Sequence, residues 1–208
     1  MALRVVGLGP GHPKLLTLMA VEALREAEVI YVPASSSSEV SLAESLVRPY
    51  TRAEVRVLKF KMGGTDEETL KRYGKEISGV ENAVYALLGD PAFYGSFARL
   101  RPYVERPVQY VPGVTSITAC AARAGIDLAV GDQAVAIVPA TRPDLLERAI
   151  ELFDTVVVVK ANKNRALLNR LMEQGGLAVR RCYMEGEQIS QRIYWDDYFT
   201  VVYIWRGR

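Results

Sequence analysis

The side chains that could take part in chemistry lie in short segments that contain glycine. They form neither a set of metal ligands nor an activated nucleophile with its base. Four segments follow or end predicted strands, and they are Gly7-Leu-Gly-Pro-Gly11, Gly89-Asp-Pro-Ala-Phe-Tyr-Gly-Ser-Phe97, Val111-Pro-Gly-Val-Thr-Ser116 and Thr155-Val-Val-Val-Val-Lys160. Glycine lets the backbone approach a ligand closely, and open α/β sheets bind ligands at the carboxyl ends of their strands. The pattern therefore favours a small ligand held largely by backbone groups.

The first glycine segment departs from the dinucleotide-binding fingerprint. Pro10 and Pro13 remove two backbone donors, and the third glycine of that fingerprint is missing. The second strand ends in Val32-Pro-Ala-Ser35, with no acidic residue to hold a ribose hydroxyl. The sequence thus argues against a nicotinamide cofactor. His12 is the one histidine, and a lone loop histidine is more often incidental than catalytic.

Composition and charge narrow the class of protein further. The chain has 208 residues, with 26 basic and 24 acidic side chains and a net charge of +2, so we expect no nucleic-acid partner. Cys120, Cys182 and His12 form no zinc-type ligand set, and we predict no metal. We expect two free thiols in a reducing cytoplasm, although the sequence leaves a disulfide open. No signal segment and no membrane-spanning run is expected.

Strand-like and helix-like segments alternate over the first half of the chain. The strand-like runs are Leu3–Leu8, Glu28–Val32, Val55–Phe60, Ala83–Leu88 and Val108–Val111. The helical patterns are Leu18–Ala27, Leu42–Val47, Asp66–Ile77 and Ser96–Tyr103. Such alternation predicts a mainly parallel sheet with helices on both faces. The serine run Ser35–Ser38 is expected to be a loop.

The second half starts with a helix and ends in strands. Helices are expected over Thr115–Ala124, Pro143–Leu152 and Asn164–Gln174, and strands over Val135–Val138, Thr155–Val159, Val179–Met184, Gln188–Trp195 and Phe199–Trp205. The last three strands lack intervening helices, which favours antiparallel pairing and a mixed sheet. We therefore predict an α/β protein of two α/β domains, residues 1–113 and 114–208, with the active site in the cleft between them.

The glycine segments together resemble a known family. With Leu16-Thr-Leu18, they are similar in type and order to the tetrapyrrole (corrin/porphyrin) methylases over essentially the whole chain. Within that family, the Gly89–Phe97 run and Gly9-Pro-Gly-His-Pro-Lys-Leu-Leu-Thr-Leu18 resemble precorrin-2 or cobalt-factor II C20-methyltransferases. His12 replaces the usual Asp of those enzymes, and Gly95-Ser96 replaces Ser-Thr.

The resemblance implies S-adenosylmethionine as methyl donor, with S-adenosylhomocysteine as its product. The implied cofactor contacts are Pro10, Leu88, Gly89, Asp90, Phe93, Thr115, Ser116, Lys160, Met184 and Gly186. Residues 1–113 would hold the substrate trough and part of the cofactor site, and 114–208 the rest. A homodimer is also expected from the resemblance.

The implied reaction transfers a methyl group to a carbon of a polycarboxylate tetrapyrrole in the cobalamin pathway. In-line transfer needs mainly alignment and exclusion of water, plus one acceptor for the proton that leaves the carbon. Tyr94 and Asp90 are the candidate catalytic residues. Arginines pair well with carboxylates, and the candidates are Arg48, Arg52, Arg99 and Arg101.

Other functions remain open at this point. A C-11, C-17 or uroporphyrinogen-III methyltransferase would share the same segments. Diphthine synthase and the ribosomal-RNA ribose methylase share the scaffold, but the Tyr94–Phe97 run argues against both. A non-catalytic nucleotide-binding module is the alternative from a different class of protein.

Overall fold

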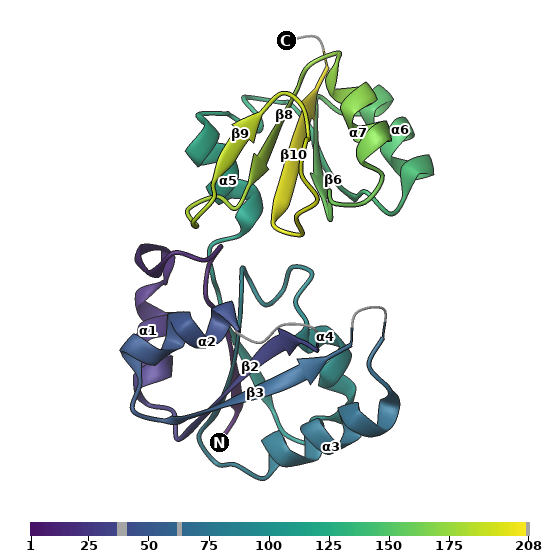
Figure 1. Ribbon diagram of the computed structural model, residues 1–208. Helices are drawn as coiled ribbons and strands as arrows, with labels where there is room; N and C mark the ends of the chain where they lie inside the picture. Colours follow the sequence, from purple (N-terminus) through teal and green to yellow (C-terminus); the bar gives the residue numbers. More distant parts are fainter. Residues whose placement is uncertain (37–40, 62–63, 207–208) are drawn as a thin grey trace. The chain divides into compact units, whose positions relative to one another are not determined.

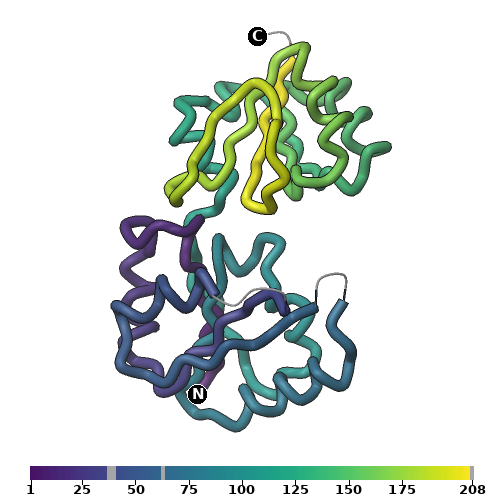
Figure 2. The backbone as a smooth tube through the Cα atoms, in the orientation of Figure 1, coloured from purple at the N-terminus to yellow at the C-terminus, as the bar shows by residue number. Residues whose placement is uncertain are grey.

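The computed structural model describes residues 1–36, 41–61 and 64–206, and the chain divides into two compact units. The first unit is Met1–Thr115 and the second is Ser116–Arg208. Figure 1 shows a sheet in each unit, and Figure 2 traces the backbone of both. No helix in the described part of the chain is long and apolar enough to cross a membrane.

The first unit is built on a five-stranded sheet with the strand order β3-β2-β4-β1-β5 (Figure 1). Its strands are β1 (Leu3–Gly7), β2 (Val29–Ser35), β3 (Glu54–Phe60), β4 (Ala83–Leu87) and β5 (Val108–Val111). Every pairing is parallel. Since parallel strands run in one direction, the turns that follow β1, β4 and β5 all leave the sheet at its carboxyl edge.

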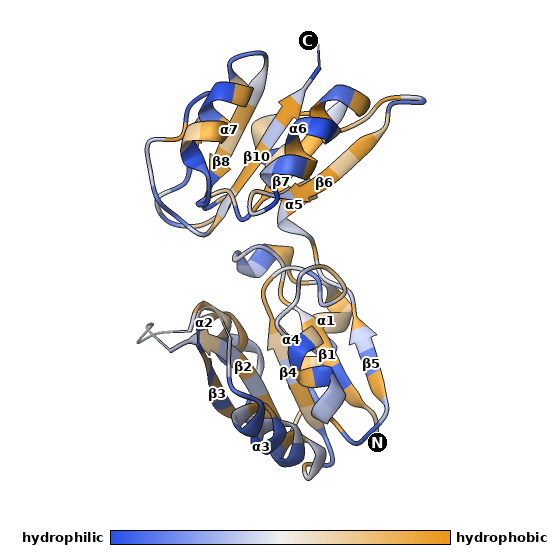
Figure 3. Cartoon of the chain, turned by 90° about the vertical axis from the view of Figure 1, so that its right-hand side faces the viewer, coloured by the Kyte–Doolittle hydropathy of each residue, from blue (hydrophilic) through white to orange (hydrophobic). Residues whose placement is uncertain are grey.

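Helices cover both faces of this sheet. The helices α1 (Leu18–Arg25) and α2 (Leu42–Val47) pack on one face, and α3 (Glu67–Ser78) and α4 (Phe97–Leu100) on the other. Short 3-10 turns complete the unit at η1 (Pro13–Leu15), η2 (Arg48–Tyr50) and η3 (Arg101–Tyr103). In Figure 3 the central strands β1 and β4 are mostly orange while α3 is mostly blue, because β1 and β4 are almost entirely buried and α3 turns a charged face to solvent.

The second unit is a mixed sheet with the order β6-β7-β10-β8-β9. Its strands are β6 (Val135–Pro139), β7 (Thr155–Val159), β8 (Gly176–Arg180), β9 (Gln188–Ser190) and β10 (Thr200–Trp205). Only β6 and β7 pair in parallel among these described strands; the other pairs are antiparallel. Helices α6 (Pro143–Leu152) and α7 (Arg165–Met172) share a core with the sheet. Helix α5 (Ser116–Ala124) is tied to β10, since the Tyr203 hydroxyl donates to the Ile117 carbonyl at 2.6 Å.

The predicted fold class of two α/β sheets, one parallel and one mixed, is confirmed. The predicted bounds of two strands are wrong. The strand expected over Val179–Met184 is β8, which starts at Gly176 and ends at Arg180, because Arg181 and Tyr183 have left-handed backbones with φ of 48° and 61°. The strand expected to reach Trp195 ends at Ser190. Beyond it, the Ile193 N–H donates to the side chain of Asn169 on α7 at 2.8 Å, which draws the chain away from β8.

Two further predictions, the serine loop and the free thiols, also differ from the structure. Ser35 ends β2 instead of starting a loop, and Ser37 and Ser38 lie outside the described residues. The prediction of two free thiols is wrong. Cys120 of α5 and Cys182, which follows β8, form a disulfide with their Cα atoms 5.5 Å apart. Both are 3% exposed, because the fold brings α5 against the turn after β8.

Candidate functional site

Two predicted glycine segments are hydrogen-bonded to each other at the carboxyl edge of the first sheet. The Leu8 N–H donates to the Leu87 carbonyl at 2.8 Å, which extends the β1–β4 pairing by one step. Gly9 and Gly89 then exchange both backbone hydrogen bonds, at 2.7 and 3.2 Å. Pro10 and Leu88 directly flank this exchange, so the fold brings together the predicted contacts at Pro10, Leu88 and Gly89.

The segment after β5 packs into the same place. A Cβ atom built on Gly113 would lie 2.2 Å from the Gly89 carbonyl oxygen and 2.8 Å from Gly7 Cα. Such distances are possible only without a side chain. Gly89 itself has a φ of 74°, the left-handed region that favours glycine. We call the backbone of Gly7–Gly9, Gly89, Asp90 and Gly113 the loop junction.

Asp90 binds two backbone amides of the loop junction. One carboxylate oxygen accepts from the Gly113 N–H at 2.9 Å and the other accepts from the Ala92 N–H at 2.8 Å. The second bond closes an Asx-type turn, and the first joins the segment after β4 to the segment after β5. Asp90 therefore acts in this structure as a bridge that sets the spacing of two segments.

Thr17 and His12 organise the remaining turn, between β1 and α1. The Thr17 hydroxyl accepts from the Ala20 N–H at 3.1 Å as the N-cap of α1, and it donates to the Pro112 carbonyl at 3.2 Å. His12 Nδ1 accepts from the Lys14 N–H at 3.1 Å and caps η1. Asp is also a good cap, so the change from Asp to His preserves the cap while it removes a charge.

Sequence reasoning noted Leu16-Thr-Leu18 without giving Thr17 a role, and gave none to Gly7. The N-cap preference of Thr just before a helical pattern is a signal that could have found Thr17. For Gly7 the glycine itself is the signal, since a Cβ there would lie 2.6 Å from the Gly89 carbonyl oxygen, but the sequence does not show which backbone approaches it.

The predicted catalytic Tyr94 and its neighbour Phe93 lie on the turn before α4. Tyr94 has a φ of 52° and a 54% exposed side chain, and the two rings meet edge to face with centroids 4.8 Å apart. The turn is anchored by Ser96, whose hydroxyl lies 3.0 Å from the hydroxyl of the buried Tyr85. Burial raises the pKa of Tyr85, so it stays a neutral partner at any physiological pH.

In the second unit, Lys160, Met184 and Gly186 lie at one edge of the sheet. β7 and β8 both pair with β10 and run in the same direction, so the chain leaves them at the same edge. Lys160 is the first residue after β7, with a φ of 55°, and Gly186 has a φ of 78°. Thr115 and Ser116 end the first unit and start the second. The cofactor contacts assigned to these residues remain predictions.

The four candidate arginines are spread over three elements of the first unit and the turn after η2. Arg48 pairs with Glu44 one helical turn earlier at 2.7 Å, and Arg101 Nη1 donates to the Val104 carbonyl at 3.5 Å. Arg52 and Arg99 are exposed. Arg99 lies on α4, which continues from the Tyr94 turn, and its role in substrate binding stays a prediction.

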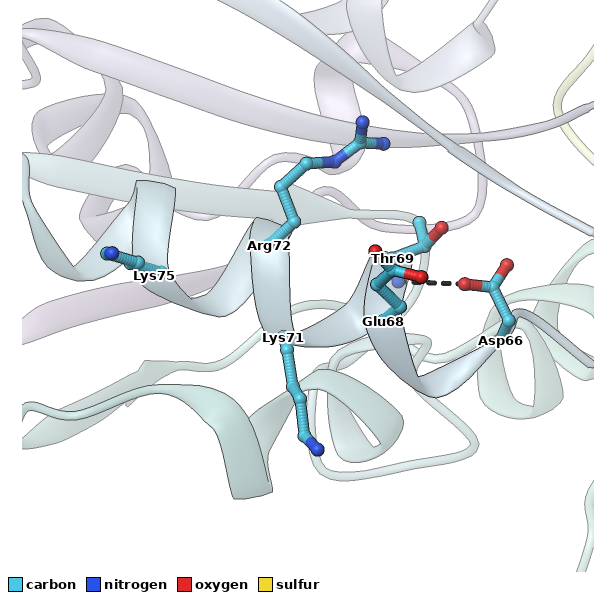
Figure 4. A pocket seen from close by; sticks show the side chains of 6 residues that line it. All are labelled: Asp66, Glu68, Thr69, Lys71, Arg72 and Lys75. Carbon is cyan, nitrogen blue, oxygen red and sulfur yellow. Dashed lines mark hydrogen bonds between the residues drawn. The ribbon is translucent and has the colours of Figure 1, made fainter.

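A hollow on α3 is lined by none of the candidate site residues (Figure 4). It is lined by Asp66, Glu68, Thr69, Lys71, Arg72 and Lys75. Asp66 caps the helix through the Thr69 N–H at 2.8 Å, and Lys71 pairs with Glu67 at 2.9 Å. Its side chains thus stabilise the helix, and none belongs to the predicted site. Among the described residues, no group of three His, Cys, Asp or Glu could hold a metal ion.

The fold and the loop junction define a class of α/β proteins that present glycine-rich turns to a ligand at the carboxyl edge of a parallel sheet. Comparison with known proteins then gives the family. The model of the "Tetrapyrrole (Corrin/Porphyrin) Methylases" matches residues 2–191, and the chain belongs to that family. The prediction that it is a methyltransferase is thereby confirmed.

Individual relatives narrow the comparison. The chain is 31% identical over 187 residues to the cobalt-precorrin-2 C(20)-methyltransferase of Salmonella typhimurium, covering 84% of this chain and 79% of that protein. It is 33% identical over 172 residues to a probable enzyme of the same name from Methanocaldococcus jannaschii, covering 78% and 74%. A solved structure of uroporphyrin-III C-methyltransferase from Thermus thermophilus with S-adenyl homocysteine has a TM-score of 0.74 at 22% identity, covering 98% and 97%. That last likeness shows the fold.

Proposed function

We propose that this methylase uses S-adenosylmethionine to methylate C20 of precorrin-2 or cobalt-factor II in cobalamin biosynthesis. The observation that carries the proposal is the similarity, over most of the chain, to two proteins named for that reaction. The Gly89–Phe97 run, which resembles the same enzymes, supports it. The expected homodimer and cytoplasmic location belong to this proposal.

The residues of the loop junction fit a nucleoside that has no phosphate. The backbone groups of Gly9 and Gly89 pair with each other, Leu88 lies between β4 and this pair, and Asp90 is the one charged residue of the junction. The Asp90 carboxylate already binds two amides. A phosphate would call for unpaired amides or cations, whereas an uncharged adenosine needs backbone partners and an apolar wall. The half-buried ring of Phe93 offers such a wall.

When bound, S-adenosylmethionine supplies an electrophilic methyl group on its sulfonium. Pro10, Leu88–Asp90, Phe93, Thr115 and Ser116 would hold it, with Lys160, Met184 and Gly186 as further contacts. The protein has to align the donor with the substrate carbon and keep water away.

We assign the proton transfer to the Tyr94 hydroxyl in preference to Asp90: the hydroxyl would take the proton that leaves the substrate carbon as it passes its own proton to water. The Asp90 carboxylate is held by the Ala92 and Gly113 amides, while Tyr94 extends from a left-handed turn with an exposed side chain. A left-handed backbone at a large residue costs energy and is found most often at functional sites. We assign Arg99 to a carboxylate of the substrate, because it lies on the helix that follows this turn.

The test is incubation of the purified protein and labelled S-adenosylmethionine with precorrin-2 and with its cobalt complex. We expect the mass of one added methyl group and an NMR label at C20. A label at C11, C17 or another carbon would assign the chain to a different tetrapyrrole methylase. Titration with S-adenosylhomocysteine, NAD and ATP separates the remaining alternative, since a general nucleotide-binding module would not bind the first alone.

A further inference from the structure

The turn between β8 and β9, residues 181–187, has a strained backbone. Arg181 and Tyr183 are left-handed although neither is glycine, with φ of 48° and 61°, and Gly186 follows with a φ of 78°. Residues in this region persist only where their surroundings hold them there, and they gather at ligand sites. We call residues 181–187 the strained turn.

Contacts from three directions hold the strained turn. The Arg181 N–H donates to the Phe199 carbonyl at 2.7 Å, and Arg181 Nε pairs with the buried carboxylate of Asp197 at 2.5 Å. Cys182 is bonded to Cys120 of α5. These contacts fix Arg181 and Cys182 to the segment just before β10 and to α5. The second half of the turn is held by a different residue.

Glu187 holds that second half. One oxygen of its carboxylate accepts the Tyr183 N–H at 2.7 Å, which closes the turn on itself. The same carboxylate forms a two-point pair with Arg123 in the last turn of α5, at 2.7 and 3.1 Å. Paired bonds of this kind fix orientation as well as distance. The Glu187 side chain is 19% exposed, so water screens the pair only in part.

We infer that Glu187 is a positioning residue for cofactor binding: it holds the backbone of Tyr183–Gly186, in which Tyr183 and Gly186 are left-handed, and fixes that backbone to α5, the helix that begins with Ser116. This inference rests on the proposed function, which places cofactor contacts at Ser116, Met184 and Gly186. The disulfide and the Arg123–Glu187 pair join α5 and the turn at two points, so these contacts move as one body.

The test compares Glu187→Ala and Glu187→Gln with the unaltered protein in calorimetric titrations with S-adenosylhomocysteine, well below the melting temperature. The alanine variant loses both interactions, and we expect its Kd to rise about tenfold, as when the competent turn falls to about one tenth of the population. The glutamine variant can still accept the Tyr183 N–H but loses the charge pair, so we expect a smaller rise. In assays, KM for S-adenosylmethionine should rise while kcat at saturation is kept.

Asp144→Ala serves as the matched control, because it removes an exposed ion pair with Arg142 in the same unit. We expect its Kd to equal that of the unaltered protein. If Glu187→Ala lowers the melting temperature but leaves Kd and KM unchanged, Glu187 is only structural and the inference is overturned. If the unaltered protein does not bind S-adenosylhomocysteine, the proposed function itself has failed, which is a different result.

Discussion

Replacement of Gly113 by alanine tests whether the loop junction depends on close backbone contact. The new Cβ would lie 2.2 Å from the Gly89 carbonyl oxygen and 2.8 Å from Gly7 Cα. Ordinary van der Waals contact begins near 3.4 Å, so at least one segment must move by about 1 Å. All the atoms in the way are backbone, and none can move by changing a side-chain rotamer.

The loss of stability that Gly113→Ala should cause can be estimated. Overpacking of a well-packed site costs about 1–3 kcal/mol, which corresponds to a fall in melting temperature of roughly 2–12 °C for a chain of this size. The same shift would separate the Asp90 carboxylate from the Gly113 N–H, now 2.9 Å away. We therefore expect Gly113→Ala to weaken S-adenosylhomocysteine binding at least tenfold, even where the protein remains folded.

Calorimetric melting and ligand titration measure the two effects, and Gly79→Ala is the matched control. Gly79 ends α3 with a φ of −80°, and a Cβ there would meet its nearest atom at 3.5 Å. We expect Gly79→Ala to melt and bind as the unaltered protein does. If Gly113→Ala also behaves like the unaltered protein, the three segments are not in close contact and the reasoning about the junction is refuted.

Three further predictions follow from other contacts. Replacing both Cys120 and Cys182 by alanine removes a cross-link over 62 residues, and calorimetry should show a loss of about 4 kcal/mol; thiol titration of the unaltered, unfolded protein should find thiols only after reduction. Burial alone raises the pKa of Asp197, but the Phe199 N–H, Arg180 and Arg181 together lower it below 3.8, so its contribution to stability is present above that pH and lost as the pH falls further. Asp197→Asn should therefore flatten the acid limb of a stability–pH curve, and an unaltered limb would contradict this. Tyr94→Phe should lower kcat about 100-fold with S-adenosylhomocysteine affinity kept, and an unchanged kcat would remove Tyr94 from proton transfer.

Much of the first unit could be predicted from sequence because its central strands β1 and β4 are almost entirely buried. Runs such as Ala83–Leu87 are apolar at every position, and β5 and α2 have the predicted bounds. The alternation of strands and helices then leaves few topologies for a parallel sheet. Convergence of the Gly9, Gly89 and Gly113 segments follows from that topology, since their strands end at one edge.

What escaped prediction has a common physical cause. The left-handed backbones of Arg181 and Tyr183 have no signature in residue type, so the strand over Val179–Met184 was drawn too long at its end. The disulfide joins residues 62 positions apart, and spacing alone cannot show that α5 lies against the turn after β8. Asp90 was singled out as a candidate site residue, but its bond to the Gly113 N–H could not be predicted, because it depends on the placement of β4 and β5 on either side of β1.

The two units hold their candidate ligand segments by opposite means, and this difference predicts opposite sensitivities to mutation. In the first unit the segments touch through backbone, so adding a single carbon at Gly113 is harmful while most side chains nearby could be trimmed. In the second unit, large residues are forced into left-handed turns by a disulfide and by the carboxylates of Asp197 and Glu187. There the harmful changes are truncations of side chains, because each one removes a contact that holds the left-handed backbone in place. A mutational scan read out by cofactor affinity should therefore find additions most damaging around Gly89 and truncations most damaging around Tyr183.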